Sequence, residues 1–318
     1  MLPVTIYNQS GGQSKSTIAR DLAGAFAELG LDVLIVDFDA QNGSVSNYLG
    51  VDGDKHNSDA DDLTLHLIDQ GKGPFADLIC PVEGEENIDV IPSHKRFNRV
   101  GDRLDQHAQY LEASKPADWE YPRYKRFLQI LQENGIRDQY DVMLVDPNAK
   151  ADVAYYLALY ATRNLVIPAV PTRGGKASIA GVEDSARNFA EEMDISITNA
   201  AVVPTMVNQS KKLHKEYTVQ IKEKYPSPVY FKDLGAYEKA EEDYVTVFSH
   251  LKSGRIRDYN SDIMPKFRTL AAYIYARAGR ELPNGGWTSD EMFLGDELWG
   301  KVDTSDLTLR EPDAPEVS

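Results

Sequence analysis

The sequence holds a single cysteine among 318 residues, Cys80, and this scarcity excludes several kinds of protein. One cysteine cannot form a disulfide within the chain, a cysteine-rich zinc site or an all-cysteine iron–sulfur cluster. Runs of about 18 apolar residues are also missing, so the sequence predicts no membrane-spanning helix. The N-terminus lacks the basic start of a secretion signal. We therefore expect a protein of a reducing, cytoplasmic compartment.

Positive charge is scarce as well, because 34 Lys and Arg stand against 50 Asp and Glu, a formal net charge of −16. Attraction to phosphate needs positive surface, so an acidic chain does not coat nucleic acid unselectively. Half of the excess follows Arg280, where ten acidic and two basic residues occur. We expect residues 281–318 to form an acidic C-terminal extension, partly disordered or docked, on a main domain of residues 1–280.

Hydrophobic residues make up 42% of the chain, enough for a sizeable core, and their pattern alternates between two periods. An apolar segment at residues 4–7 precedes a helical pattern that ends near Gly30. The continuously apolar residues 33–36 follow, as in a strand buried on both faces. Further apolar runs occur at residues 88–91, 142–145, 165–167 and 200–203. This order predicts an α/β fold, with a mostly parallel, doubly wound sheet flanked by helices.

A polar, glycine-containing segment, Asn8–Thr17, joins the first predicted strand to the first helix. Backbone N–H groups and the positive end of the helix dipole at such a turn attract an anion. Lys15 adds a full charge where β- and γ-phosphates would lie, and the Ser16 hydroxyl can bind Mg²⁺. These features favour a nucleotide site over an ordinary polar turn.

The same segment resembles the deviant Walker A motif, Lys-Gly-Gly-x-Gly-Lys-[Ser/Thr], of the ParA/MinD superfamily of P-loop ATPases. Asp37–Gln41 resembles that family's Asp-x-Asp-Pro-Gln stretch, and Tyr140–Asp146 resembles its Walker B strand. Similar segments continue in order to about residue 280. The chain most resembles the ParA-type plasmid and chromosome partition ATPases. The resemblance implies an ATPase that uses ATP/ADP and Mg²⁺, and a homodimer that forms on ATP binding and separates after hydrolysis.

The resemblance also implies roles for residues on the phosphate side of the site. Lys15 would hold the β- and γ-phosphates, Ser16 would bind Mg²⁺, and Thr17 would contact the α-phosphate. Asn208 would contact adenine. The implied nucleotide-binding set is Gly11, Gly12, Gln13, Ser14, Lys15, Ser16, Thr17 and Asn208.

Three carboxylates complete the implied site. Asp39 would polarise the attacking water, and Asp37 and Asp146 would support Mg²⁺ through water molecules. Carboxylates at the ends of parallel strands can reach a metal or water at the carboxyl edge of a sheet. The alternative for Asp37 and Asp146 is a carboxylate that caps a nearby turn.

Two positions depart from the family motif. Ser10 stands where the signature lysine normally reaches the partner's phosphates, and it brings no charge. We expect slow hydrolysis or a substitute cation, for which Lys150, Arg173 and Lys176 are candidates; for the last two, a solvated turn is the alternative. Ser14 stands where a glycine belongs, and a serine held at positive φ costs about 1 kcal/mol.

ParA dimers bind DNA without sequence preference and respond to a ParB-like centromere-binding protein, and the resemblance implies both partners here. The candidate DNA-binding residues are Lys211, Lys212, Lys215, Arg255, Arg257, Lys266 and Arg268. An equally good alternative is a solvated surface of mixed charge, because acidic residues lie among them. The prolines and acidic residues at the C-terminus argue against a membrane-binding helix like that of the MinD branch.

Two functions remain open from the sequence. In the first, the chain is a partition ATPase, nucleoid-associated when ATP-bound, whose weak hydrolysis resets the switch. In the second, it is a non-hydrolysing, nucleotide-dependent scaffold of the same fold.

Overall fold

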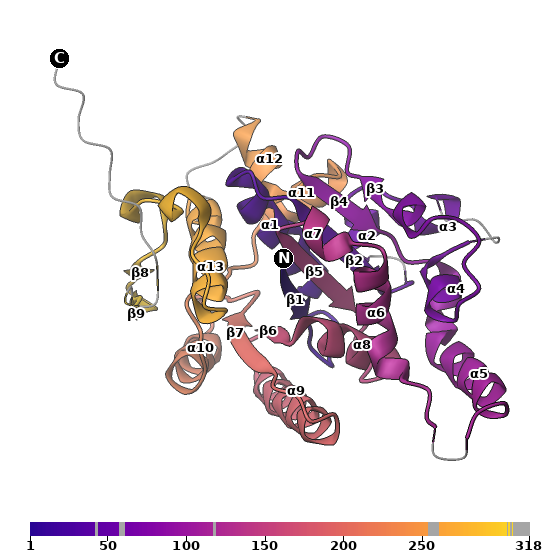
Figure 1. The fold of residues 1–318 in the computed structure, drawn as a ribbon. Helices are drawn as coiled ribbons and strands as arrows, with labels where there is room; N and C mark the ends of the chain where they lie inside the picture. Colours follow the sequence, from indigo (N-terminus) through magenta and orange to yellow (C-terminus); the bar gives the residue numbers. More distant parts are fainter. Residues whose placement is uncertain are drawn as a thin grey trace.

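The computed structural model describes residues 1–41, 44–56, 61–116, 119–253, 261–303, 305 and 307. Its centre is a seven-stranded sheet (Figure 1) with the strand order β3-β4-β2-β5-β1-β6-β7. The strands are β1 Leu2–Ile6, β2 Val33–Phe38, β3 Cys80–Pro81, β4 Ile88–Ile91, β5 Val142–Pro147, β6 Asn164–Ala169 and β7 Thr198–Pro204. All of their pairings are parallel except that of β3 with β4. The predicted α/β fold with a mostly parallel sheet is confirmed.

Helices cover both faces of this sheet (Figure 1). One face is covered by α1 Lys15–Glu28, α11 Gly235–Glu242, α12 Val247–Lys252 and α13 Ile263–Arg277. The other is covered by α4 Leu63–Leu67, α5 Val100–Glu112, α6 Arg126–Glu133, α7 Ile136–Gln139, α8 Val153–Thr162, α9 Arg173–Glu192 and α10 Lys212–Lys224. Two short helices, α2 Val45–Tyr48 and α3 Gly53–His56, follow β2.

The period of two along β2 explains these layers. Val33 and Ile35 join the hydrophobic cluster beneath α1 and α13, whereas Leu34 and Val36 join the cluster beneath α6 and α8. Side chains that alternate between two apolar faces require a continuously hydrophobic strand, as the sequence predicted.

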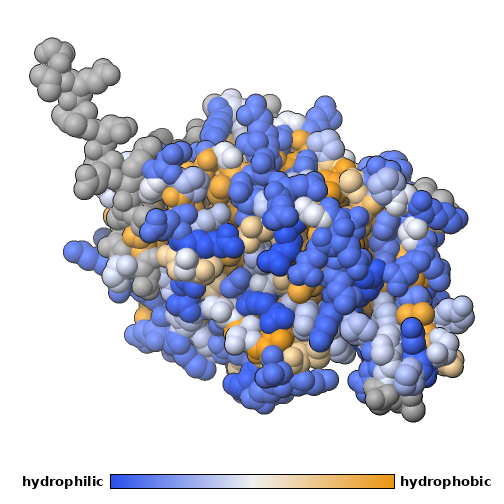
Figure 2. All heavy atoms as spheres, viewed as in Figure 1, coloured by the Kyte–Doolittle hydropathy of each residue, from blue (hydrophilic) through white to orange (hydrophobic). Residues whose placement is uncertain are grey.

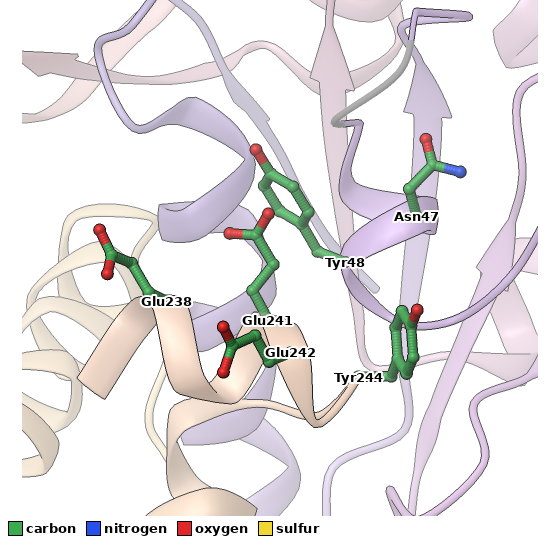
Figure 3. Close-up of a pocket in the computed structure, with 6 residues that line it drawn as sticks. All are labelled: Asn47, Tyr48, Glu238, Glu241, Glu242 and Tyr244. Atoms are coloured by element: carbon green, nitrogen blue, oxygen red, sulfur yellow. The ribbon is translucent and has the colours of Figure 1, made fainter. Parts of the chain in front are cut away.

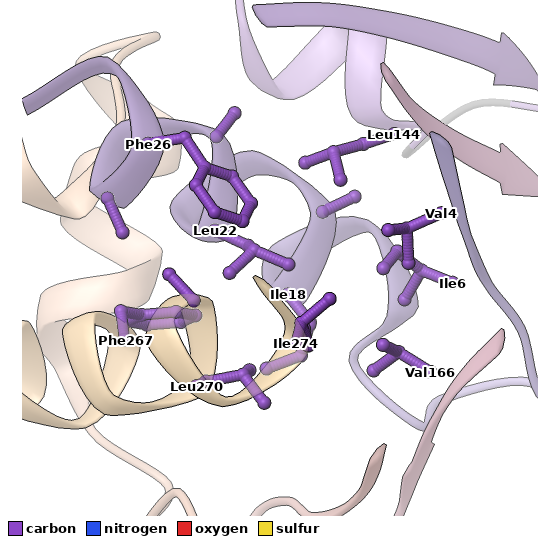
Figure 4. Close-up of a cluster of buried hydrophobic side chains, with 14 of the residues drawn as sticks. Val4, Ile6, Ile18, Leu22, Phe26, Leu144, Val166, Phe267, Leu270 and Ile274 are labelled. Atoms are coloured by element: carbon purple, nitrogen blue, oxygen red, sulfur yellow. The ribbon is translucent and has the colours of Figure 1, made fainter. Parts of the chain in front are cut away.

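Helix α1, which carries the phosphate loop at its start, is fixed by an apolar face against the sheet and α13. Ile18, Leu22 and Phe26 recur every four residues, so they lie on one side of α1 (Figure 4). Phe267 and Leu270 of α13 face them in the same cluster. Complete burial of each large apolar side chain stabilises the fold by about 1.5–3 kcal/mol, so this packing fixes the position of α1 and of its first turn.

The acidic extension packs against the body over its described part. Trp287, Phe293 and Trp299 are all buried in the main cluster. The Trp299 Nε1 atom donates a hydrogen bond to the Pro228 carbonyl oxygen at 3.0 Å, and a short strand pair, β8 Gly295–Asp296 and β9 Gly300–Lys301, lies nearby. Residues 304, 306 and 308–318 lie outside the described residues.

The surface in Figure 2 is largely hydrophilic, with small separated apolar areas. Among the described residues, no helix combines the length and apolar character that crossing a membrane would require.

Candidate functional site

The predicted phosphate loop lies at the carboxyl edge of the sheet, between β1 and α1. Lys15 is the first residue of α1. Gly11 and Gly12 are exposed, and a Cβ atom placed on either glycine would meet no other atom within 4 Å. Gly12 has a positive φ of 67°. An open glycine turn at a helix N-terminus is the arrangement that binds phosphate groups.

Ser14 immediately precedes α1 in a left-handed conformation, with φ 61° and ψ 31°. Its side chain makes no capping hydrogen bond to the helix. The sequence predicted strain at Ser14 if its φ is positive, and the structure shows that it is. A serine in this conformation costs about 1 kcal/mol relative to glycine.

We expect Ser14→Gly to stabilise the nucleotide-free protein by about 1 kcal/mol, because glycine adopts the left-handed conformation without strain. Thermal unfolding should show a melting temperature roughly 2–4 °C higher. Ser10→Gly is the matched control, since Ser10 is not among the described residues with positive φ. An equal fall in melting temperature for both variants would refute strain at Ser14.

Ser16 and Asp146 meet beneath the phosphate loop. The Ser16 hydroxyl donates a hydrogen bond to Asp146 Oδ2 at 2.6 Å, which joins α1 to the end of β5. Asp146 is fully buried, and its Oδ1 atom has no hydrogen-bond partner within the described part of the chain. Burial raises the pKa of Asp146 to about 7, although the charge of Lys15 opposes this shift.

This pair fits a hard divalent cation. Carboxylate and hydroxyl oxygens are the ligands that Mg²⁺ prefers, directly or through water. A buried carboxylate oxygen without a partner is costly, and a cation or its bound water would satisfy it. The residues present are therefore compatible with the Mg²⁺ ion that the sequence implies.

Asp37, near the end of β2, differs from Asp146 because both of its carboxylate oxygens accept hydrogen bonds. Its Oδ1 atom accepts a hydrogen bond from the Asp39 N–H at 2.9 Å, and its Oδ2 atom accepts hydrogen bonds from the Ser46 N–H at 3.1 Å and the Ser46 hydroxyl. Burial raises the pKa of Asp37 to about 6, and the bonds from Ser46 and Ser44 oppose the shift. In this structure Asp37 holds the turn that carries Asp39, as the turn-capping alternative describes; support of Mg²⁺ stays a prediction.

Asp39 is partly exposed beside the phosphate loop. Its carboxylate accepts a hydrogen bond from the Gln41 N–H at 3.1 Å. Partial burial raises the pKa of Asp39, while the positive charges of Lys15 and Lys150 act in the opposite direction. The carboxylate proposed to polarise water therefore lies within the electrostatic influence of two lysines.

The three candidate substitute cations have different surroundings. Lys176 donates a hydrogen bond to Gln220, and its ammonium lies 5.1 Å from the ring centre of Tyr217, so it is directed toward α10. Arg173 is exposed at the start of α9. Lys150 is exposed in the loop after β5, and of the three only Lys150 is seen to influence the pKa of Asp39.

A hollow of about 150 Å³ adjoins the first turn of α1. It is lined by Ser14, Thr17, Ile18, Thr205, Met206, Phe231, Lys232, Asp233, Leu234, Tyr237, Glu238 and Glu241. Asn208 is not part of this lining; its side-chain oxygen accepts hydrogen bonds from the Ser210 N–H and hydroxyl at 3.0 and 2.6 Å. Sequence reasoning missed the lining residues of 231–237, because only the fold brings that segment to the phosphate loop.

A larger hollow of about 490 Å³ lies between α2 and α11 (Figure 3). It is lined by Asn47, Tyr48, Glu238, Glu241, Glu242 and Tyr244. Burial and the nearby Glu238 and Glu242 raise the pKa of Glu241, whereas Arg20 opposes the shift. Three carboxylates repel phosphate, so the larger hollow does not suit a nucleotide's phosphates.

Two of the residues predicted to form a basic DNA-binding surface are paired with carboxylates instead. Lys266 is buried, with its ammonium 2.7 Å from Asp262 and 3.8 Å from the Tyr230 ring centre. Arg268 forms a two-point ion pair with Glu28 at 2.7 and 2.9 Å. Neither side chain is free to neutralise a DNA phosphate. Lys211, Lys212 and Lys215 are exposed around the start of α10, whereas Arg255 and Arg257 lie outside the described residues.

The sequence model of a family described as an AAA domain (AAA_31) matches residues 1–200, more than half of the chain. An uncharacterized protein of Methanocaldococcus jannaschii is 25% identical over 285 residues, covering 86% of this chain and 98% of that protein. The sporulation initiation inhibitor protein Soj of Bacillus subtilis is 24% identical over 229 residues, covering 71% and 81%. A probable plasmid-partitioning protein ParA of Thermus thermophilus is 26% identical over 192 residues, covering 60% and 51%.

Solved structures show the same fold. The ATP complex of McdA from Cyanothece superposes with a TM-score of 0.67 at 16% identity, covering 88% of this chain and 97% of that one. The septum site-determining protein MinD of Pyrococcus horikoshii, complexed with Mg-ADP, has a TM-score of 0.59 at 16% identity, covering 87% and 96%. The chain belongs to the ParA/MinD superfamily of P-loop ATPases and within it is closest to the partition ATPases.

Proposed function

We propose that this protein is a Mg²⁺-ATP-dependent partition ATPase of the ParA type. It binds ATP, pairs with a second copy, binds DNA without sequence preference, and is reset by slow hydrolysis. One observation carries the proposal: Lys15 and Ser16 open α1 on an exposed glycine loop, and Ser16 bonds to the buried, half-satisfied carboxylate of Asp146.

The roles of the residues follow from charge and position. Lys15 neutralises the β- and γ-phosphates, and the N–H groups around Gly12 surround them. Ser16 and Asp146 hold Mg²⁺, which supplies charge neutralisation between the phosphates. Asp39 orients and polarises the attacking water, helped by the turn that Asp37 fixes. The hollow beside Thr17 has room for part of the base and ribose, and its carboxylates Asp233, Glu238 and Glu241 make it unsuited to the phosphates themselves.

Lys150 is the substitute cation in this proposal. Ser10 brings no charge, and Lys176 is directed toward α10. Lys150 lies on the loop after the Walker B strand, and its charge already acts on Asp39. A lysine at this place can stabilise negative charge that develops on the γ-phosphate during hydrolysis.

Lys150→Gln should lower phosphate release at least about 10-fold, while the affinity for Mg-ADP changes less than about twofold. Ser10→Lys, which restores the family's lysine, should raise phosphate release above wild type and rescue Lys150→Gln in the double variant. Lys176→Gln is the control with unchanged release. If Lys150→Gln releases phosphate at the wild-type rate, or if Ser10→Lys does not raise the rate, Lys150 is not the substitute cation.

DNA binding in this proposal uses the exposed start of α10. Lys211, Lys212 and Lys215 are exposed, and Lys212 has only a weak ion pair with Glu216, at 3.6 Å between surface side chains. Such lysines release counterions from DNA, so affinity should fall steeply with salt. The name of the relative in Thermus thermophilus, a probable plasmid-partitioning protein, supports a role in partition. A ParB-like protein is the partner in this proposal.

A non-hydrolysing, nucleotide-dependent scaffold is the second candidate, favoured by the missing charge at Ser10. Calorimetric titration with Mg-ADP and Mg-ATP tests what both candidates share. Binding that requires Mg²⁺ supports them, whereas no heat and no thermal stabilisation at millimolar nucleotide would reject both. Phosphate release then separates the ATPase from the scaffold.

A further inference from the structure

Asn8, between β1 and the phosphate loop, joins three segments of the chain. Its side chain is completely buried. The Nδ2 atom donates hydrogen bonds to the Pro168 carbonyl oxygen at 2.8 Å and to the Ser178 hydroxyl at 3.1 Å. The Oδ1 atom accepts a hydrogen bond from the Ser10 N–H at 2.9 Å. Both donors and the acceptor are therefore used, and they connect the loop to β6 and α9.

The connection to α9 continues beyond Asn8. The Ser178 hydroxyl accepts from Asn8 and donates to the Gly175 carbonyl oxygen at 2.8 Å in the first turn of α9. That turn lies against the end of β6 so closely that a Cβ atom on Gly175 would come within 1.9 Å of the Val170 carbonyl oxygen. The partner of Asn8 is thus itself held in a tightly packed turn.

Gln13 fixes the other end of the loop to the residues that follow β6 and β7. The Val170 N–H donates a hydrogen bond to Gln13 Oε1 at 2.8 Å, and the Thr205 hydroxyl donates one to the Gln13 carbonyl oxygen at 3.3 Å. Although the sequence placed Gln13 among the nucleotide-binding residues, its side-chain oxygen is directed to Val170, just after β6. Between these two anchors, Gly11 and Gly12 remain exposed.

We propose that Asn8 is a positioning residue that holds the phosphate loop in its binding conformation before nucleotide arrives, by anchoring it to β6 and α9. This inference rests on the proposed function for its ligand. A loop that is already ordered loses less conformational entropy on binding, so the anchor strengthens affinity without touching the nucleotide. Asn8 and Gln13 make four hydrogen bonds that tie the loop to other segments, and Asn8 contributes two of them.

The test compares Asn8→Ala with Asn164→Ala. Asn164 makes the same kind of bridge between the same two strands, but at their other end, where its Nδ2 atom donates to the Pro3 carbonyl oxygen at 3.0 Å. Asn8→Ala loses buried hydrogen bonds and Asn164→Ala loses a part-buried one, so both variants should lower the melting temperature. Only Asn8→Ala should weaken Mg-ADP binding, about 10-fold or more, as measured by calorimetry under conditions where both variants are folded.

A second readout needs no ligand. Hydrogen exchange of residues 10–13 in the nucleotide-free protein should accelerate in Asn8→Ala and stay at the wild-type rate in Asn164→Ala. If wild type binds Mg-ADP and Asn8→Ala binds it as tightly as Asn164→Ala, the proposal is wrong. If wild type binds no nucleotide, the proposed function fails, and hydrogen exchange alone tests whether Asn8 orders the loop. Unchanged exchange in Asn8→Ala would then overturn the proposal for Asn8.

Discussion

Mg²⁺-nucleotide binding should be lost in Lys15→Ala, with a dissociation constant at least about 100-fold higher than that of wild type. Hydrogen bonds to charged groups contribute about 1.5–3 kcal/mol each, and a lysine on phosphates makes more than one such contact. The loss also reaches the metal site. Lys15 opposes the pKa increase of Asp146, so its removal favours the protonated carboxyl, which binds Mg²⁺ poorly.

Calorimetric titration of Lys15→Ala with Mg-ATP and Mg-ADP measures this effect. Lys176→Ala is the control, because it removes a lysine of α9 that contacts Gln220 and Tyr217 instead of the phosphate loop. A Lys15→Ala variant that remains folded and binds within about threefold of wild type would mean that the nucleotide does not use this loop.

Asp146→Asn should change stability and Mg²⁺ binding in opposite directions. The pKa of Asp146 in the folded protein is about 7, against an ordinary value of 3.8. A raised pKa means that the folded state disfavours the charged carboxylate, so stability is lost as pH rises from about 4 through about 7. Asparagine cannot ionise, so the variant escapes this loss.

At pH 8 and without nucleotide, Asp146→Asn should therefore be more stable by about 1–2 kcal/mol, with a melting temperature roughly 2–8 °C higher. The difference should shrink toward pH 5, where the wild-type carboxyl in the folded state is largely protonated. The dependence of nucleotide binding on Mg²⁺ should disappear in the variant, as seen by titrations with and without a chelator.

Asp37→Asn is the matched control for this prediction. Asp37 is also buried, but its two oxygens accept hydrogen bonds from Asp39 and Ser46. An asparagine there replaces one acceptor by a donor and should destabilise the protein by about 1–3 kcal/mol. If Asp146→Asn destabilises the protein as much as Asp37→Asn at pH 8, the uncompensated charge inferred at Asp146 is not there.

The parts of the site that depend on nearby residues were predictable from the sequence. The apolar runs placed β1, β2 and β5 correctly, and a parallel sheet brings the ends of such strands to one edge. The positive φ of Ser14 was expected from a motif position that normally holds glycine. These features are set by periodicity and local backbone geometry.

The parts that depend on contacts between distant segments were not predictable. Lys266 carries a charge and was assigned to a DNA-binding surface. The ring centre of Phe293, in the extension, lies 4.7 Å from its ammonium and helps bury it. For Asp37 the sequence left both Mg²⁺ support and turn capping open, and only the placement of Ser46 by α2 shows the capping bonds. The importance of Asn8 depends on Ser178, which lies 170 residues away along the chain.

We expect this protein to hydrolyse ATP at the phosphate loop, with Asp39 as the residue that polarises the attacking water. Phosphate release from Mg-ATP by wild type and Asp39→Ala, each with and without duplex DNA, tests it most directly. We predict slow release by wild type, at least about 10-fold slower release by Asp39→Ala, and unchanged Mg-ATP binding in that variant. Equal release by the two proteins, or binding of Mg-ATP by wild type with no release at all, would contradict the claim.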